Sequence, residues 1–166
     1  MNPAGNFTLV PRFTMSTGSN PKRQTPERVL LVDDNDLGLK ARMIVLEELG
    51  YHVTAVCCSV QALERFQTQT FDLVITDYKM PRLDGIELIA KIREVQPAVP
   101  IVLISGFAEA LGLTDANTGA DIVIQKNYHE ITALTRAVER LLNRRPQRKP
   151  LRSQVFQARR VAAAQR

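Results

Sequence analysis

The stretch VLLVDDND, from Val29 to Asp36, joins a short apolar segment directly to a group of acidic residues. Val29–Val32 is apolar throughout, which is typical of a strand that is buried on both faces of a parallel sheet. Asp33 and Asp34 follow at the point where this strand should end. The stretch therefore predicts a buried strand with two adjacent carboxylates at its carboxyl end.

A helix is predicted directly after this stretch. Apolar residues recur at helical spacing from 37 to 49, and Gly50 is a suitable C-cap. We expect the apolar face of this helix to consist of Leu37, Ala41, Ile44, Val45 and Leu49.

The alternation of strands and helices continues to residue 142. Further strands are predicted at 51–57, 71–76, 99–105 and 121–124. Ser59 is a suitable cap for a helix with Ala62, Leu63 and Phe66 on its apolar face. The later helices are predicted around 88–92, over an alanine-rich segment at 109–117, and at 131–142. Five strands that alternate with five helices predict an α/β fold, a doubly wound five-stranded parallel sheet with helices on both faces.

Polar side chains gather where the predicted strands end. In such sheets, ligands bind beyond the carboxyl ends of the strands. The residues at these ends are Asp33, Asp34, Asp77, Ser105 and Lys126. Taken singly, an Asp or Ser after a strand is often a helix cap, and a lone Lys is usually solvated. Their joint occurrence at the ends of four strands favours a functional site.

The chemistry of this set points to phosphoryl transfer. Three carboxylates that lie close together repel one another unless a cation or protons neutralise them. Oxygen ligands without His or Cys favour Mg²⁺. Such an ion, with Lys126 and the Ser105 hydroxyl, suits the oxygens of a phosphoryl group. Asp77 stands alone at the end of a central strand, so it is the candidate nucleophile.

The segments VLLVDDN, DLVITDYKMPRLDG, PIVLISG and IVIQK resemble the receiver domain of bacterial response regulators over residues 28–143. This resemblance implies a flavodoxin-like fold with strand order 2-1-3-4-5 and a domain at 28–144. It implies that Asp77 accepts a phosphoryl group from a sensor histidine kinase or phosphotransfer protein. Asp34 would bind Mg²⁺ directly, Asp33 chiefly through water, and the backbone carbonyl of Lys79 would complete the metal site. Lys126 and Ser105 would contact the phosphoryl group.

Two positions depart from the pattern of this family. Asn127 stands where a proline usually follows the lysine after a cis bond. A cis bond before a non-proline residue costs about 3–4 kcal/mol, so we expect a trans Lys126–Asn127 bond or a strained loop. Val123 replaces the aromatic residue whose ring usually switches position, and its β-branched side chain has little rotamer freedom. Lys79 and Phe107 occupy positions that flank the site in this family, where they either cover it or point into solvent.

The excess of positive charge lies toward the two ends of the chain. The chain carries a net charge of +5, of which eight positive charges follow Asn143 and a net of three lies in residues 1–28. The remainder, −6, falls on the residues between them. We expect residues 1–27 to be a mobile leader and residues 145–166 to be a basic tail, disordered or a short helix, which is either solvated or in contact with an acidic partner. Sequence-specific DNA binding is not expected of such a tail.

The resemblance implies a stand-alone receiver in a two-component phosphorelay, whose only chemistry is its own phosphorylation and dephosphorylation. Its output would be a protein contact through the fourth helix, fifth strand and fifth helix. With no membrane span or secretory signal in the sequence, we expect a cytoplasmic protein. One alternative is a phosphorylation-independent interaction module, since Val123 and Asn127 would fit a relaxed switch. A phosphatase is disfavoured, because Lys79 occupies the position where such enzymes commonly carry a second acid.

Overall fold

The structure is a computed structural model that describes residues 25–143. The basic tail and nearly all of the leader lie outside these residues, so both stay predictions. Ten elements alternate along the described chain. They are β1 Arg28–Val32, α1 Asp36–Glu48, β2 His52–Val56, α2 Ser59–Thr68, β3 Leu73–Asp77, α3 Gly85–Val95, β4 Ile101–Ser105, α4 Asp115–Thr118, β5 Ile122–Gln125 and α5 Glu130–Asn143. None of the helices in this part of the chain is long and apolar enough to cross a membrane.

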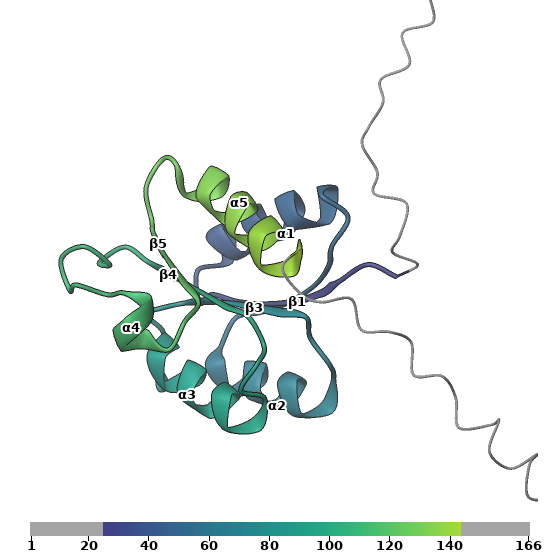
Figure 1. Cartoon of the computed structure of the whole chain (residues 1–166), viewed down its shortest axis with the longest axis horizontal. Helices are drawn as coiled ribbons and strands as arrows, with labels where there is room; N and C mark the ends of the chain where they lie inside the picture. Colours follow the sequence, from purple (N-terminus) through teal and green to yellow (C-terminus); the bar gives the residue numbers. More distant parts are fainter. Residues whose placement is uncertain (1–24, 144–166) are drawn as a thin grey trace, which may run out of the picture.

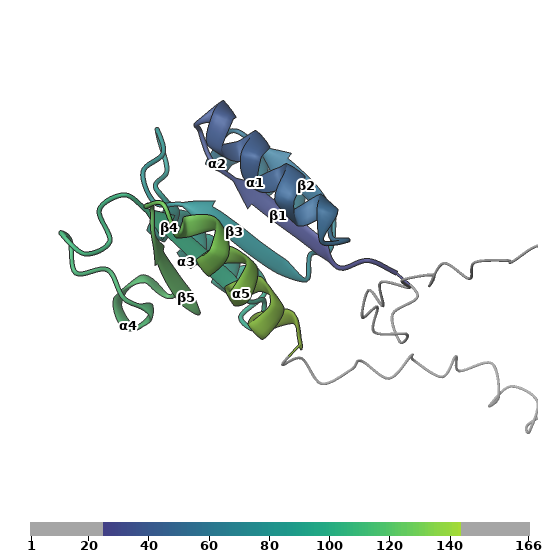
Figure 2. The same ribbon diagram turned by 90° about the horizontal axis from the view of Figure 1, so that it is seen from above.

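The five strands form one parallel sheet in the order β2-β1-β3-β4-β5. Helices α1 and α5 cover one face of the sheet, and α2 and α3 cover the other (Figure 1). Seen from above, α1 and α5 lie on the same side of the sheet along different strands (Figure 2). The predicted fold class and strand order are therefore confirmed. Because all strands run the same way, the residues that follow β1, β3, β4 and β5 lie at one edge.

Each strand contributes to two separate cores. Along β1, Leu30 and Val32 pack with α2 and α3, whereas Val29 and Leu31 pack with α1 and α5. Successive side chains of a strand point to opposite faces, so a strand between two helical layers is mainly apolar on both faces. This is why VLLV carries no polar residue before Asp33.

The predicted apolar face of α1 is wrong. Its buried residues are Leu39, Arg42 and Leu46, whereas Leu37 is 80% exposed and Ile44 is 52% exposed. The pattern misled because one of the inward positions is an arginine, whose charge is paired inside the protein. An interpretation based on apolar residues alone therefore selects the opposite side of this helix.

The predicted helix at 109–117 is also wrong. Its first part forms turns, and α4 is a single helical turn at Asp115–Thr118. Gly112 adopts a left-handed backbone conformation with φ of 60°, which interrupts the helix. The side chain of Asn117 then accepts a hydrogen bond from the Thr114 N–H at 2.8 Å and starts the new turn.

Ser59 does not cap α2. Cys58 occupies the N-cap position without a side-chain hydrogen bond, and Ser59 is the first helical residue. The Ser59 hydroxyl is buried and finds no partner among the described residues. The backbone therefore enters this helix one residue earlier than the sequence pattern indicates. By contrast, α1 is capped by Asn35, whose side chain accepts from the Gly38 N–H at 2.9 Å.

Candidate functional site

Three carboxylates meet at the carboxyl edge of the sheet. Asp33 and Asp34 follow β1, and Asp77 is the last residue of β3, the central strand. One oxygen from each lies within 4.8 Å of the others. Asp33 and Asp77 are buried, at 1% and 6% exposure, and Asp34 is exposed. The convergence that the strand ends predict is therefore present in the structure.

Lys126 reaches two of these acids. Its Nζ lies 2.8 Å from Asp77 Oδ1 and 3.2 Å from Asp33 Oδ2. The residue is placed by its own backbone, because the Lys126 N–H donates to the Ser105 carbonyl at 2.8 Å. There is no cis peptide bond within residues 25–143, so the prediction of a trans Lys126–Asn127 bond is confirmed. The long lysine side chain brings its ammonium to the acids without the cis bond.

Asn127 stabilises the turn between β5 and α5, at the position where a proline usually stands in this family. Its side-chain oxygen accepts a hydrogen bond from the His129 N–H at 2.8 Å. Its carbonyl oxygen accepts from the Glu130 N–H at 3.0 Å. A side chain that accepts from the backbone two residues ahead forms a local turn, which fixes the chain where a proline would otherwise restrict it. The departure at this position is thus structurally accommodated.

Ser105 ends β4 at the same edge. It is buried, and its hydroxyl oxygen accepts a hydrogen bond from the Phe107 N–H at 3.0 Å. In this structure the hydroxyl therefore shapes the turn after β4. Because the oxygen is the acceptor in that bond, the hydroxyl proton can be donated to another group.

Lys79 and Phe107 pack against each other above the edge. The Lys79 ammonium lies 5.5 Å from the centre of the Phe107 ring, within range of a cation–π contact. Both residues are exposed, and they join the loop after β3 to the loop after β4. The two side chains were expected either to cover the site or to point into solvent. In the structure they are exposed, and each packs against the other.

Val123 lies in β5, paired with Leu103 of β4. It is half-buried and packs against the core on the side of α2 and α3. Its short branched side chain is held by that core. An inward and outward movement like that of an aromatic ring is therefore not available at this position.

Arg42 and Glu130 belong to the site although the sequence analysis missed them. One terminal nitrogen of Arg42 lies 2.5 Å from Asp33 Oδ2, and its Nε lies 2.6 Å from Glu130 Oε1. Burial alone would lower the pKa of Arg42. The hydrogen bond and charge of Glu130, followed by those of Asp33, outweigh it and raise the pKa. A signal was present in the sequence: Arg42 stands three residues after Leu39 and four before Leu46, at inward spacing.

The pKa of Asp77 is raised above its ordinary value. Burial is the main cause, and the negative charge of Asp33 adds to it. The hydrogen bond and charge of Lys126, and the N–H of Tyr78, act in the opposite direction without cancelling the effect. A carboxylate with a raised pKa is more basic, which suits a nucleophile.

Asp77→Asn should raise the thermal stability of the metal-free protein at neutral pH. The folded-state pKa of Asp77 is raised, so this group contributes its stability at acidic pH, below its unfolded pKa. That contribution is lost as the pH rises through the folded pKa. The advantage of the variant should therefore be small in acid and grow toward neutrality, as measured by melting curves at several pH values with a chelator. A variant that is less stable at neutral pH would contradict this.

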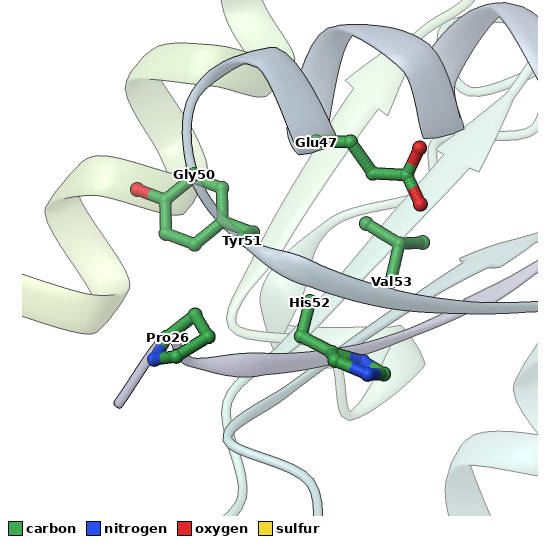
Figure 3. Close-up of a pocket in the computed structure, with 6 residues that line it drawn as sticks. All are labelled: Pro26, Glu47, Gly50, Tyr51, His52 and Val53. Carbon is green, nitrogen blue, oxygen red and sulfur yellow. The ribbon is translucent and has the colours of Figure 1, made fainter. Parts of the chain in front are cut away.

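A hollow of about 260 Å³ lies away from the acids, where β1 and β2 begin. Figure 3 shows its lining residues, Pro26, Glu47, Gly50, Tyr51, His52 and Val53. The acids lie where the strands end, so this hollow takes no part in the candidate site.

The comparison with protein families identifies the class. Residues 29–139 match the model of the response regulator receiver domain, and the chain belongs to this family. The response regulator receiver protein CpdR of Brucella abortus is 38% identical over 120 residues, which cover 70% of this chain and 97% of that protein. A gliding motility regulatory protein of Myxococcus xanthus is 31% identical over 134 residues, 74% of this chain but 17% of that protein.

Solved structures agree with this assignment. The response regulator TrrA of Thermotoga maritima, in complex with Mg²⁺-BeF, is 28% identical and gives a TM-score of 0.64. The match covers 70% of this chain and 99% of that one. The receiver domain of a sensor histidine kinase from Pseudomonas aeruginosa, with a magnesium ion coordinated in its active site cleft, is 26% identical with a TM-score of 0.65. That match covers 72% of this chain and 99% of the other.

Proposed function

We propose that this protein accepts a phosphoryl group on Asp77 from a histidine kinase or phosphotransfer protein and signals through protein contacts. The observation that carries the proposal is the placement of Asp77 at the end of the central strand. There its carboxylate is paired with Lys126 and lies beside Asp33 and Asp34. In the transfer, an Asp77 oxygen forms a bond to phosphorus as the bond from phosphorus to the donor imidazole nitrogen breaks. The electron pair of the broken bond goes to that nitrogen.

The acidic cluster fits a divalent cation. Its ligand atoms are carboxylate oxygens with no His or Cys among them, and this donor set favours Mg²⁺. Asp33, Asp34, Asp77 and the backbone carbonyl of Lys79 would hold the ion. Two similar receiver structures carry magnesium, which supports the same choice here. When bound, Mg²⁺ would offset the negative charge of the phosphoryl oxygens.

Lys126 and Ser105 would bind the transferred group. In the unphosphorylated protein the Lys126 ammonium contacts Asp77, so it already lies beside the atom that would carry phosphorus. Ser105 has a hydroxyl proton that it can donate to a phosphoryl oxygen. A preorganised cation and donor stabilise charge that develops in the transition state without reorganisation at that moment.

Exposed apolar side chains on α1 and in the loop after β5 suit a partner that delivers the phosphoryl group. Leu37 and Ile44 lie on the outer face of α1, and Tyr128, two residues after Lys126, is 91% exposed. A contiguous apolar patch in water marks a contact surface, and Leu37 and Ile44, seven residues apart in α1, lie on the same side of this helix. The downstream partner would contact β5 and α5, as expected from the sequence. It would also contact the one-turn α4 and the loop before it, which stand where a longer helix was expected.

Acetyl phosphate with Mg²⁺ should add one phosphoryl group to the protein, detected by intact-mass spectrometry. Acetyl phosphate is a small acyl phosphate that can replace the protein donor, so no cognate kinase is needed. Excess EDTA should reduce the adduct strongly, since the negative charges at the edge would then face the anionic donor unshielded. Equal labelling with and without EDTA would contradict the metal-dependent part of the proposal.

A protein-interaction module that does not depend on phosphorylation is the second candidate. It is favoured by Val123, because this residue cannot perform the aromatic switch. Absence of any adduct with acetyl phosphate and Mg²⁺, at donor concentrations that label another receiver fully, would favour this function.

A further inference from the structure

The acidic edge contains a buried cation that the proposed phosphoryl transfer does not use. Arg42 is only 5% exposed, and its guanidinium contacts both Asp33 and Glu130, the second of which lies 88 residues further along the chain. A charge this deeply buried must be paired, since an unpaired one would be strongly destabilising. The planar guanidinium allows Arg42 to bond two acids at once from different nitrogens.

The helix leaves room for this guanidinium. A Cβ atom added at Gly38 would lie 2.9 Å from the Arg42 terminal nitrogen that contacts Asp33. Glycine inside a helix is less favourable than alanine, because it loses more conformational freedom on folding. The first turn of α1 therefore contains a glycine, Gly38, that is unfavourable for the helix. Because it has no side chain, it leaves space for the guanidinium of Arg42.

Both carboxylate oxygens of Asp33 accept hydrogen bonds from other groups of the protein. Its Oδ2 accepts from Arg42 at 2.5 Å and from Lys126 at 3.2 Å. Its Oδ1 accepts from the Asn35 N–H at 2.7 Å. An incoming divalent cation would therefore meet a carboxylate on which two positive groups are placed. Of these, Arg42 is the closer and the more buried.

We infer that Arg42 is a built-in counter-ion of this site, a positioning residue that holds Asp33 in the metal-free protein and competes with a divalent cation for it. The inference rests on the proposed function, because it concerns the metal site of that function. Glu130, at the start of α5, retains the guanidinium when the contact with Asp33 is given up.

Mg²⁺ binding to the full chain, measured by isothermal titration calorimetry, tests the inference. Arg42→Met removes the charge and keeps an unbranched apolar side chain, so Mg²⁺ should bind about tenfold more tightly, within the usual range of coupling between sites. Glu130→Gln should weaken binding, because Arg42 then has Asp33 as its only anionic partner. Lys40→Met is the matched control. It removes the same charge from an exposed position on the same helix and should change the affinity by less than about twofold.

Gly38→Ala tests the contact between Arg42 and Asp33 without removing the positive charge of Arg42. The added methyl group displaces the flexible end of Arg42 from Asp33 while the positive charge stays in the protein. Mg²⁺ should again bind more tightly, and this variant also answers the question if Arg42→Met does not fold. A merely structural arginine would give weaker or unchanged binding in both variants.

The outcomes separate this inference from the proposed function. Wild-type binding that is unchanged or weakened in Arg42→Met and Gly38→Ala overturns the role of Arg42 and leaves the proposed function standing. Absence of Mg²⁺ binding in the wild type and in all variants contradicts both. Tight binding only in the variants would support the inference, with Arg42 as the dominant competitor.

Discussion

Asp77→Asn should reduce the phosphoryl adduct formed from acetyl phosphate to below detection. The amide that replaces the carboxylate cannot form the acyl phosphate, so the nucleophile itself is lost. Time-resolved intact-mass spectra in saturating Mg²⁺ would measure the effect. The variant is also expected to be at least as stable as the wild type at neutral pH, so misfolding would not account for the loss.

Asp36→Asn is the matched control for this variant. Asp36 is an exposed acid in the first turn of α1, near the site in sequence, and its replacement changes the net charge by the same amount. It should label at close to the wild-type rate. An adduct of the wild-type size on Asp77→Asn would place the phosphoryl group elsewhere and remove the main support of the proposed function.

Gly85→Ala should lower the free energy of unfolding by about 2–3 kcal/mol, the upper part of the usual range for overpacking. A Cβ atom at Gly85 would lie 2.3 Å from the Asp77 carbonyl oxygen and 2.9 Å from both Leu103 Cδ1 and Tyr78 Cα. Two of these atoms are backbone, which cannot rotate away. Because α3 begins at this residue, directly against the end of β3, the strand or the helix would have to shift. Urea denaturation followed by circular dichroism would measure the loss.

Gly106→Ala is the control for this substitution. Gly106 follows Ser105, and a Cβ atom there would meet nothing within 4 Å. Its backbone is not among those with positive φ, so alanine is tolerated there. The expected change is within about 0.5 kcal/mol. Similar destabilisation by both substitutions would show that close packing at Gly85 is not the cause.

Much of the acidic site could be predicted because it follows from strand direction. Asp33, Asp34, Asp77 and Lys126 were identified from their positions after apolar segments, and parallel strands bring such positions to one edge. Ser105 was placed at this edge by the same reasoning. The hydrogen bond of its hydroxyl to the loop after β4 was not foreseen, since it depends on the path of that loop.

For the segment Lys126–Asn127, the sequence could predict the conformation of the peptide bond but not the position of the lysine ammonium. The energy of a cis bond before a non-proline residue is a property of the peptide itself, so the trans bond could be predicted. Whether the ammonium would still reach Asp77 depended on the whole edge of the sheet. The structure shows that it does, at 2.8 Å.

Patterns along the chain were sufficient for the α/β class, since burial between two layers of helices requires apolar strands and helical spacing between them. They were not sufficient for the inward face of α1 or for the interruption at Gly112. The Arg42 pair needed tertiary structure, because its second partner, Glu130, is distant in sequence and adjacent only after folding. A buried charge is stable only where an oppositely charged group lies beside it. Which groups lie side by side is decided by the packing of the folded protein.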